Sequence, residues 1–340
     1  MKKRYIEDWI FYWIALCVKG FFSPFPYRIG VAFGAGIIYG LSFFYSRRFS
    51  VAYLNLKSTF PSKEPSEIKW LIRRSMFNIG LSLMEFMLSP KLDRKKILGF
   101  VDIKGVDDLK EKLAAKSGLI FLTAHYNSWE LLPFVGDLLG LQIYVIAREQ
   151  KYPRLNRLLN DYRSKRGCVV VEKGFSLKTI FRVLKEGKSV GILADQNAGR
   201  NGIQVKFFGR FASTNPGFIS IARATKSDVR PVFLRRTGIF KHEMILYPNM
   251  DLNKPDREIL SEYNSILERY IRNNPEQWLW FHKRWKHSVN KNILIISDGK
   301  PGHYKQSRMV AEMLKQLLIE KNIREWGMPD EALIKIQEVE

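Results

Sequence analysis

From residue 117 onward, short apolar stretches alternate with amphipathic ones, and this alternation constrains the fold more than any other feature of the chain. Apolar runs of about four to eight residues bounded by turn residues are typical of strands, and apolar residues at helical intervals are typical of helices. The series therefore predicts an α/β fold, a mixed sheet flanked by helices. The predicted strands are 118–124, 142–147, 168–172, 189–194, 229–235 and 243–247, and the predicted helices are 128–139, 153–165, 176–186, 214–226 and 256–273.

The first predicted strand leads into a histidine and a glutamate, His125 and Glu130. In α/β sheets, binding sites gather at the carboxyl ends of the strands. Side chains five residues apart do not share a helical face, so this pair meets only if His125 lies in the turn and Glu130 in the first helical turn. With Asn127 or Ser128 as N-cap, the helix dipole would keep Glu130 ionised, and Glu130 would then orient the imidazole for proton abstraction. On spacing alone, a loop histidine beside a surface glutamate fits equally well.

The charge of the chain indicates what it binds. Its 340 residues include 56 Lys and Arg against 33 Asp and Glu, a net charge of +23. Such a surface favours phosphate-bearing or acidic partners, such as anionic lipid head groups, nucleic acid or an acidic carrier protein. Cys17 and Cys168 make neither a disulfide framework nor a metal motif, and His282 and His287 lack supporting carboxylates. We therefore expect neither a metal nor a cofactor.

Two apolar runs open the chain, 9–22 and 29–45. Neither reaches the roughly 20 residues of a robust membrane-spanning helix. Three interpretations stay open: a membrane helix beside an interfacial helix, a hairpin lying in one leaflet, or a pair of buried helices in a soluble fold. The basic residues at 2–4 and 47–48 would lie on the cytoplasmic side of a membrane. We expect residues 1–48 to form a membrane anchor or interfacial helices.

Two basic segments suit an anionic ligand. Residues 148–166 carry seven Lys and Arg against two acids, although a solvated helix face explains such a run as well. Residues 274–286, NPEQWLWFHKRWK, mix tryptophans with cations. Aromatic side chains interleaved with cations are suited to a phosphate-bearing interface, lipid or nucleic acid.

A further strand ends in Asp195 and Gln196 and is followed by a glycine-rich stretch, 197–217, that contains Phe207 and Phe208. Glycines next to aromatic residues in a loop indicate close backbone approach beside an apolar surface. The alternative is an ordinary loop tucked on the core.

Taken together, these stretches resemble the late acyltransferases of lipid A assembly, the lauroyl and myristoyl acyltransferase family, and their actinobacterial mannoside-acylating relatives. The likeness spans about residues 5–288, with an α/β acyltransferase domain of glycerolipid-acyltransferase type expected over 49–288. The motifs that carry it are, in order, NLKSTFP at 55–61, H-x4-E at His125, RSKRG at 163–167, Asp195-Gln196 through Phe207-Phe208-Gly209, and PEQWLWFHKRWK.

The resemblance implies a membrane-bound enzyme at the cytoplasmic face of the bacterial inner membrane. It would move a fatty acyl chain from acyl carrier protein to a hydroxyl of a lipid A precursor or similar glycolipid, with no role in nucleic-acid binding. The chain has no G-x-S-x-G elbow and no cysteine paired with a nearby histidine, so we expect direct attack without an acyl-enzyme. Alternatives are another acceptor, such as a phosphatidylinositol mannoside or a lysolipid with acyl-CoA as donor, or a non-catalytic basic protein that binds membranes or nucleic acid.

Roles for individual residues follow from the same resemblance. His125 would be the general base with Glu130 as its partner, Arg163 would hold the substrate or the developing oxyanion, and Asp195 would be the family's structural or catalytic aspartate. Base catalysis of this kind typically contributes about 10²–10⁴-fold. The substrate contacts implied are Asn127, Arg148, Arg166, Gln196, Phe207 and Phe208.

The last 52 residues, 289–340, form a segment of their own. An apolar strand at 292–297, the stretch DGKPGH at 298–303 and a helix at 308–321 resemble the opening of the glycosyltransferase-like mitochondrial-fission family. A lone βα unit cannot bury its faces. We therefore expect either the start of a truncated second domain or a tail packed on the first sheet, and assign it no function.

Overall fold

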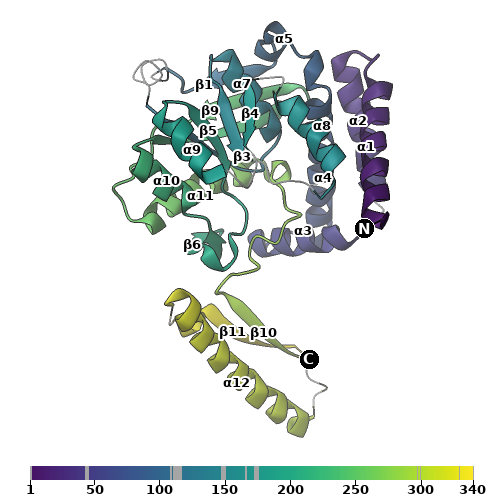
Figure 1. Ribbon diagram of the computed structural model, residues 1–340. Coiled ribbons are helices and arrows are strands. Elements are labelled where there is room, and N and C mark those ends of the chain that lie inside the picture. Colours follow the sequence, from purple (N-terminus) through teal and green to yellow (C-terminus); the bar gives the residue numbers. More distant parts are fainter. Residues whose placement is uncertain are drawn as a thin grey trace. The chain divides into compact units, whose positions relative to one another are not determined.

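The computed structural model describes residues 2–42, 46–107, 109, 117–146, 151–164, 167–171, 176–296, 298, 300–328 and 330–339. The chain divides into two compact units, each of which draws on separated segments (Figure 1). Unit 1 comprises Met1–Asp195, Gly217–Lys254 and Ile266–His282, and unit 2 comprises Gln196–Pro216, Pro255–Ser265 and Lys283–Glu340.

Unit 1 is built on a sheet that has seven strands in the described part of the chain, in the order β1-β9-β8-β2-β5-β3-β4. All neighbouring strands are parallel except β8 and β9, which form an antiparallel pair. The predicted α/β fold with a mixed sheet is therefore confirmed. The strands are β1 (Val101–Lys104), β2 (Leu119–Thr123), β3 (Ile143–Ile146), β4 (Cys168–Val171), β5 (Ser189–Leu193), β8 (Asp228–Gly238) and β9 (Lys241–Leu246).

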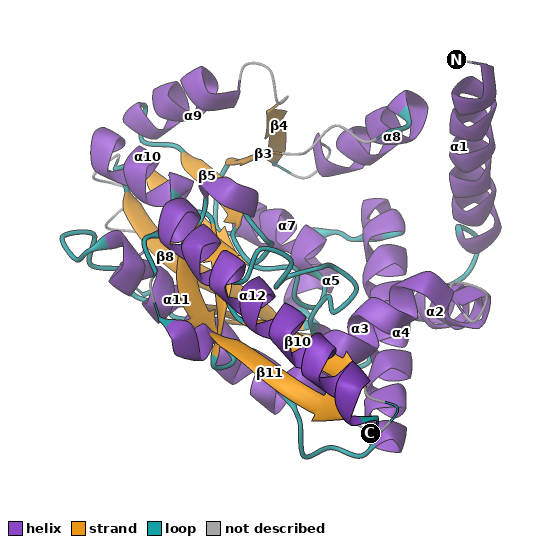
Figure 2. Ribbon diagram, turned by 90° about the horizontal axis from the view of Figure 1, so that it is seen from below, coloured by secondary structure: helices purple, strands orange, loops and turns teal. Residues whose placement is uncertain are grey.

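Helices flank this sheet, as the alternating sequence pattern predicts (Figure 2). Every residue of β2 is buried, because the strand lies in the middle of the sheet with helices over it. Apolar side chains such as Phe121 from β2, Phe134 from α7 and Leu234 from β8 belong to one buried cluster. The flanking helices are α4 (Pro65–Met87), α5 (Arg94–Leu98), α7 (Leu132–Leu138), α8 (Pro153–Ser164), α9 (Ser176–Lys185), α10 (Gly217–Thr225) and α11 (Asp256–Asn273).

The chain opens with α1 (Lys2–Phe22), α2 (Tyr27–Ser42) and α3 (Ser46–Thr59). Small residues bring α2 against α4: a Cβ atom added at Gly34 would lie 2.5 Å from Cε of Met84, and one added at Gly80 would lie 3.0 Å from the carbonyl oxygen of Ala35. One face of α2 is thus part of the folded domain. Among the described residues, none of the helices combines the length and the apolar character that crossing a membrane requires. The expected membrane-spanning helix is therefore not supported.

Unit 2 contains two β structures. The first is an antiparallel hairpin of β6 (Ile203–Phe207) and β7 (Arg210–Thr214), where the sequence led us to expect a loop over 197–217. Phe208 and Gly209 form its two-residue turn, both with positive φ (51° and 72°). Two-residue hairpin turns are usually recognised in a sequence by Asn-Gly or Asp-Gly. The Phe-Gly pair does not give that signal, so the sequence did not predict this hairpin.

The second structure follows residue 289. Strand β10 (Lys291–Ile296) and helix α12 (Pro301–Trp326) occur where we expected a strand and a helix, and α12 extends beyond the predicted 308–321. A further strand, β11 (Ile334–Val339), pairs in parallel with β10 and makes a βαβ unit that the sequence pattern did not reveal.

A buried charge network ties α4 to the sheet of unit 1. Oε1 and Oε2 of Glu85 on α4 accept hydrogen bonds from Nη1 and Nη2 of Arg236 on β8 (2.8 and 2.7 Å), and Oε1 also lies 3.1 Å from Nε2 of His242 on β9. All three side chains are buried. Burial raises the pKa of Glu85, but the charges of Arg236 and His242 and their hydrogen bonds outweigh burial and lower the pKa to about 2. The carboxylate is therefore ionised in the folded protein.

We expect Glu85→Ala to lower the free energy of unfolding by about 3–5 kcal/mol, because it leaves Arg236 buried without its counter-charge. Denaturant titration followed by tryptophan fluorescence measures the change. Glu67→Ala is the matched control: Glu67 pairs with Lys63 and caps the exposed start of the same helix, so its loss should cost only about 1 kcal/mol. Because the folded-state pKa of Glu85 is depressed, its contribution should be present above pH 4.5 and disappear as the pH falls towards 2. Equal midpoints for the two variants would contradict the network's role.

Candidate active site

The site is built on the loop that follows β2. Tyr126 forms an antiparallel bridge with Trp278. The backbone N–H of Asn127 donates to the carbonyl oxygen of Gln277 (2.7 Å), and the N–H of Leu279 donates to that of His125 (3.1 Å). The segment from Gln277 to Leu279 therefore fixes the backbone on both sides of His125.

Asn127 adopts a left-handed backbone conformation (φ 48°), which asparagine tolerates better than most residues. Its Nδ2 donates to the carbonyl oxygen of Leu234 (3.1 Å), and its Oδ1 accepts from Nε of Arg236 (3.1 Å). The next side chain, Ser128, hydrogen-bonds to Glu85 and to Nη2 of Arg236. The expected substrate contact by Asn127 is therefore corrected: its side chain is buried in the Glu85–Arg236 network, where it shapes the turn.

The carboxylate that hydrogen-bonds to His125 is Asp195, at the carboxyl end of the neighbouring strand β5. Oδ1 of Asp195 lies 2.8 Å from Nδ1 of His125, and Oδ2 accepts from the backbone N–H of His125 (3.1 Å). Oδ2 also accepts from the indole N–H of Trp278 (2.9 Å). The Asp195 side chain is fully shielded from solvent, whereas that of His125 is 18% exposed.

These contacts determine the charge states. Burial raises the pKa of Asp195, but the positive field of His125 and hydrogen bonds from His125 and Trp278 outweigh it, and the pKa lies far below its ordinary value. Burial lowers the pKa of His125, but Asp195, and more weakly the charge of Glu130, raise it above 6.5 overall. Since an ionised carboxylate only accepts, Nδ1 of His125 carries the proton towards Asp195, and Nε2 is the basic nitrogen of the neutral ring.

Glu130 has another partner. It lies in the short helical turn Trp129–Leu131 that precedes α7, where the spacing argument put it. Its two oxygens accept from Nε and Nη2 of Arg163, at the end of α8 (3.0 and 2.6 Å). The expected direct pairing of Glu130 with His125 is thus corrected. Glu130 acts on the histidine through its charge, while Asp195 makes the hydrogen bond to the ring.

The other predicted ligand contacts fall in different places. Phe207 and Phe208 are buried, and the Phe207 ring stacks on Trp285 (5.7 Å between centroids), so they pack the interior of unit 2. Their contact with a substrate stays a prediction. Gln196 is exposed at the start of unit 2. Arg148 and Arg166 lie outside the described residues. In the part of the chain that the structure describes, no group of three or more His, Cys, Asp or Glu side chains could hold a metal ion.

A histidine held by a buried carboxylate, at the carboxyl end of a central strand of an α/β fold, is a candidate general base. The sequence model of the family described as bacterial lipid A biosynthesis acyltransferase matches residues 1–287. The chain belongs to this family and is an acyltransferase.

Several characterised relatives are similar to the chain over most of its length. It is 26% identical to the lipid A biosynthesis palmitoleoyltransferase of Escherichia coli K12 over 293 residues, which is 84% of this chain and 94% of the relative. It is 24% identical to the lipid A biosynthesis lauroyltransferase of the same organism, over 81% of this chain and 90% of the relative. The phosphatidylinositol mannoside acyltransferase of Mycolicibacterium smegmatis is 24% identical over 63% of this chain and 72% of its own length.

We expect Asp195→Asn to lower the pKa of His125 more than Glu130→Gln does, because Asp195 supplies both charge and a hydrogen bond whereas Glu130 supplies charge alone. NMR titration of ring-labelled histidine measures both shifts. Glu186→Gln, a surface change on the neighbouring α9–β5 turn, should leave the His125 pKa unchanged. A larger shift from Glu130→Gln would restore Glu130 as the principal partner.

Proposed function

We propose that the chain transfers a fatty acyl group from an acyl thioester, preferably on acyl carrier protein, to a hydroxyl of a lipid A precursor or similar glycolipid. The observation that carries this proposal is the His125–Asp195 pair beside β2 in a member of an acyltransferase family. The relatives named as lipid A palmitoleoyl- and lauroyltransferases support the acceptor. The net charge of +23 suits both an acidic carrier and a phosphorylated glycolipid.

In the proposed mechanism, Nε2 of His125 accepts the proton of the acceptor hydroxyl as its oxygen attacks the thioester carbonyl. The ionised Asp195 stabilises the imidazolium that forms, as the acid of a catalytic triad does. The tetrahedral intermediate then collapses: the carbon–sulfur bond breaks, the ester carbonyl reforms, and the leaving thiolate takes the proton from His125. No group is left on the enzyme.

Arg163 fits an indirect role in this mechanism. Its Nε and Nη2 donate to Glu130 and its Nη1 donates to Asn160 (3.1 Å). We therefore assign it to holding Glu130, whose charge adds to that of Asp195 at the histidine.

Cys168 offers no competing covalent route. It is buried, and desolvation raises the pKa of its thiol to about 12, although the Arg163 charge opposes that shift. A thiol of this kind carries no appreciable thiolate at neutral pH. This supports direct attack by the acceptor hydroxyl.

We expect His125→Ala and Asp195→Asn each to reduce kcat by about 10²–10⁴-fold, because each removes proton transfer or its orientation. In the wild-type enzyme kcat/KM should rise with pH through an apparent pKa above 6.5, since the neutral imidazole is the reactive form. Mass spectrometry of the product, with the same acyl group supplied on acyl carrier protein or on CoA, measures the rate and the donor. Offering a lipid A precursor beside a phosphatidylinositol mannoside identifies the acceptor. Full activity in His125→Ala would contradict the mechanism.

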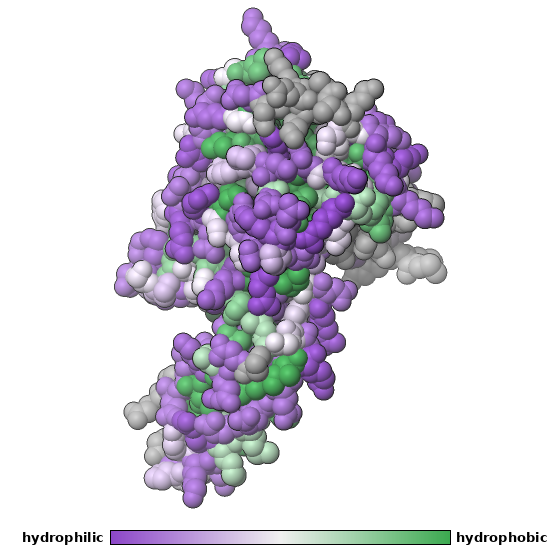
Figure 3. Space-filling model, turned by 90° about the vertical axis from the view of Figure 1, so that its left-hand side faces the viewer, coloured by the Kyte–Doolittle hydropathy of each residue, from purple (hydrophilic) through white to green (hydrophobic). Residues whose placement is uncertain are grey.

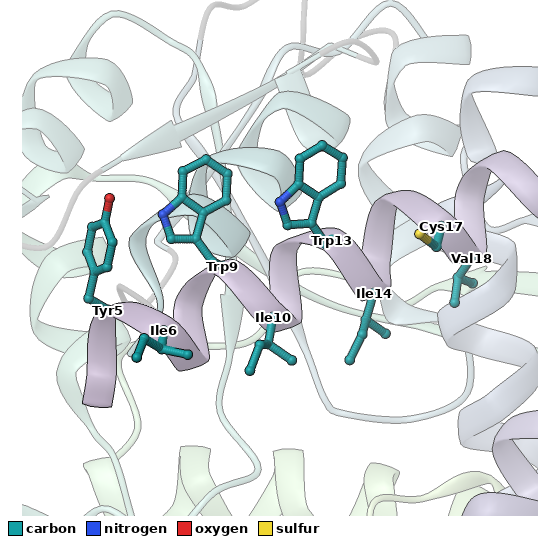
Figure 4. Close-up of a pocket in the computed structure, with 8 residues that line it drawn as sticks. All are labelled: Tyr5, Ile6, Trp9, Ile10, Trp13, Ile14, Cys17 and Val18. Atoms are coloured by element: carbon teal, nitrogen blue, oxygen red, sulfur yellow. The ribbon is translucent and has the colours of Figure 1, made fainter. Parts of the chain in front are cut away.

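We further propose that α1 and α2 lie in one leaflet of the cytoplasmic membrane. Apolar side chains remain exposed at i, i+4 spacing along the α2 face: Ile29, Phe33, Ile37 and Leu41. Helix α1 bears a row of Tyr5, Trp9 and Trp13 and a row of Ile6, Ile10 and Ile14, around a hollow of about 550 Å³ lined by eight side chains of that helix alone (Figure 4).

The opposite side of unit 1 differs. Viewed from the side of α9 and α10, the surface of unit 1 is mostly hydrophilic (Figure 3). Exposed apolar stripes on two neighbouring helices, with cations nearby, are typical of an interfacial rather than a spanning element. Asp8 on α1 pairs with Arg154 on α8 (2.8 Å). Helix α8 also carries Arg163, so the same helix contacts the proposed membrane-binding helix and the candidate site.

We expect the double change Ile10→Asp and Ile14→Asp to weaken binding to anionic vesicles at least tenfold, because it removes apolar burial and adds negative charge. Vesicle flotation measures the bound fraction. Leu177→Asp is the control: Leu177 is exposed to a similar degree (58%) but lies on α9. Unchanged flotation of the double variant would contradict the leaflet model.

A further inference from the structure

Trp278 occupies an unusual position for a tryptophan of an aromatic and basic segment. The sequence pattern PEQWLWFHKRWK suited a lipid or nucleic-acid interface, yet the Trp278 side chain is 1% exposed. Its indole N–H donates to Oδ2 of Asp195 (2.9 Å). Its backbone forms the bridge to Tyr126, the residue after His125. Trp278 therefore contacts Asp195 through its side chain and the residue after His125 through its backbone.

The two oxygens of Asp195 are used differently. Oδ2 accepts from the indole of Trp278 and from the backbone N–H of His125, while Oδ1 faces Nδ1 of His125. A carboxylate free to turn about its Cβ–Cγ bond would present either oxygen to the ring. The indole N–H, together with the backbone N–H, holds Oδ2 in place and so fixes Oδ1 opposite Nδ1.

We propose that Trp278 is a positioning residue for acyl transfer, which sets the rotamer of Asp195 and thereby the tautomer and orientation of His125. This inference rests on the proposed role of His125 as general base. The proposed series of contacts runs from Trp278 to Asp195, from Asp195 to Nδ1 of His125, and from Nε2 of His125 to the acceptor hydroxyl.

Trp280 provides a matched comparison two residues away. It is equally buried, and its indole N–H also donates, but to the carbonyl oxygen of Pro275 (2.6 Å). The two rings contact each other edge to face (4.7 Å between centroids). Replacing either residue by Phe removes one buried indole N–H and the same ring volume, and only one replacement touches Asp195.

The experiment compares Trp278→Phe with Trp280→Phe in the purified full-length enzyme, assayed with an acyl thioester and a glycolipid acceptor. We expect kcat to fall about 10–100-fold in Trp278→Phe, with KM nearly unchanged, because misplacing a catalytic group costs rate rather than binding. The acid limb of its kcat/KM profile should move to lower pH, since a loosened and better hydrated Asp195 raises the His125 pKa less. Trp280→Phe should keep both the rate and the profile of the wild type, and thermal unfolding reports whether the two variants are equally folded.

A double-variant cycle separates positioning from general destabilisation. In an Asp195→Asn background, Trp278→Phe should cause little further loss, because its effect acts through that carboxylate. Additive losses, or a Trp278→Phe enzyme that behaves like Trp280→Phe, would overturn the inference while His125→Ala remained inactive. An active His125→Ala enzyme would instead overturn the proposed function itself, so the two failures are distinguishable.

Discussion

The buried carboxylate of Asp195 is the interaction on which the rest of the site depends. A buried charge is tolerated only when hydrogen bonds and a counter-charge compensate its lost hydration. Asp195 obtains these from His125 and from Trp278. Satisfying one charge thus brings together the ends of β2 and β5 and a segment near residue 278.

A second buried charge, that of Glu85, stabilises the same loop. Glu85, Arg236 and His242 form a network that also engages Asn127 and Ser128, the two residues that turn the chain after Tyr126. The left-handed conformation of Asn127 is maintained because its amide bonds in this network. The loop that carries the histidine is therefore held between two polar assemblies, which leaves little freedom for the imidazole.

The N-terminal helices both pack on the folded domain and present an exposed apolar surface. The glycines of α2 allow close contact with α4, and the apolar row on its other face remains exposed. The apolar character that made these segments look like membrane helices is thus divided between domain packing and an outward surface. Hydropathy along the sequence could not separate these uses, because it does not say which face of a helix is covered.

Periodicity by itself predicted the α/β class, the order of helices and strands from residue 117 apart from the β6–β7 hairpin and β11, and the place of His125 at a strand end. These are local signals, since the period of apolar residues is set within one element. The tertiary structure decided which carboxylate serves the histidine: Asp195 is 70 residues away, and only the parallel pairing of β2 with β5 brings it close. It likewise decided that Glu130 pairs with Arg163, that Trp278 reaches inward and that Phe207 packs a core. Contacts between distant segments depend on how the sheet is ordered, and the order of strands is not written in any local pattern.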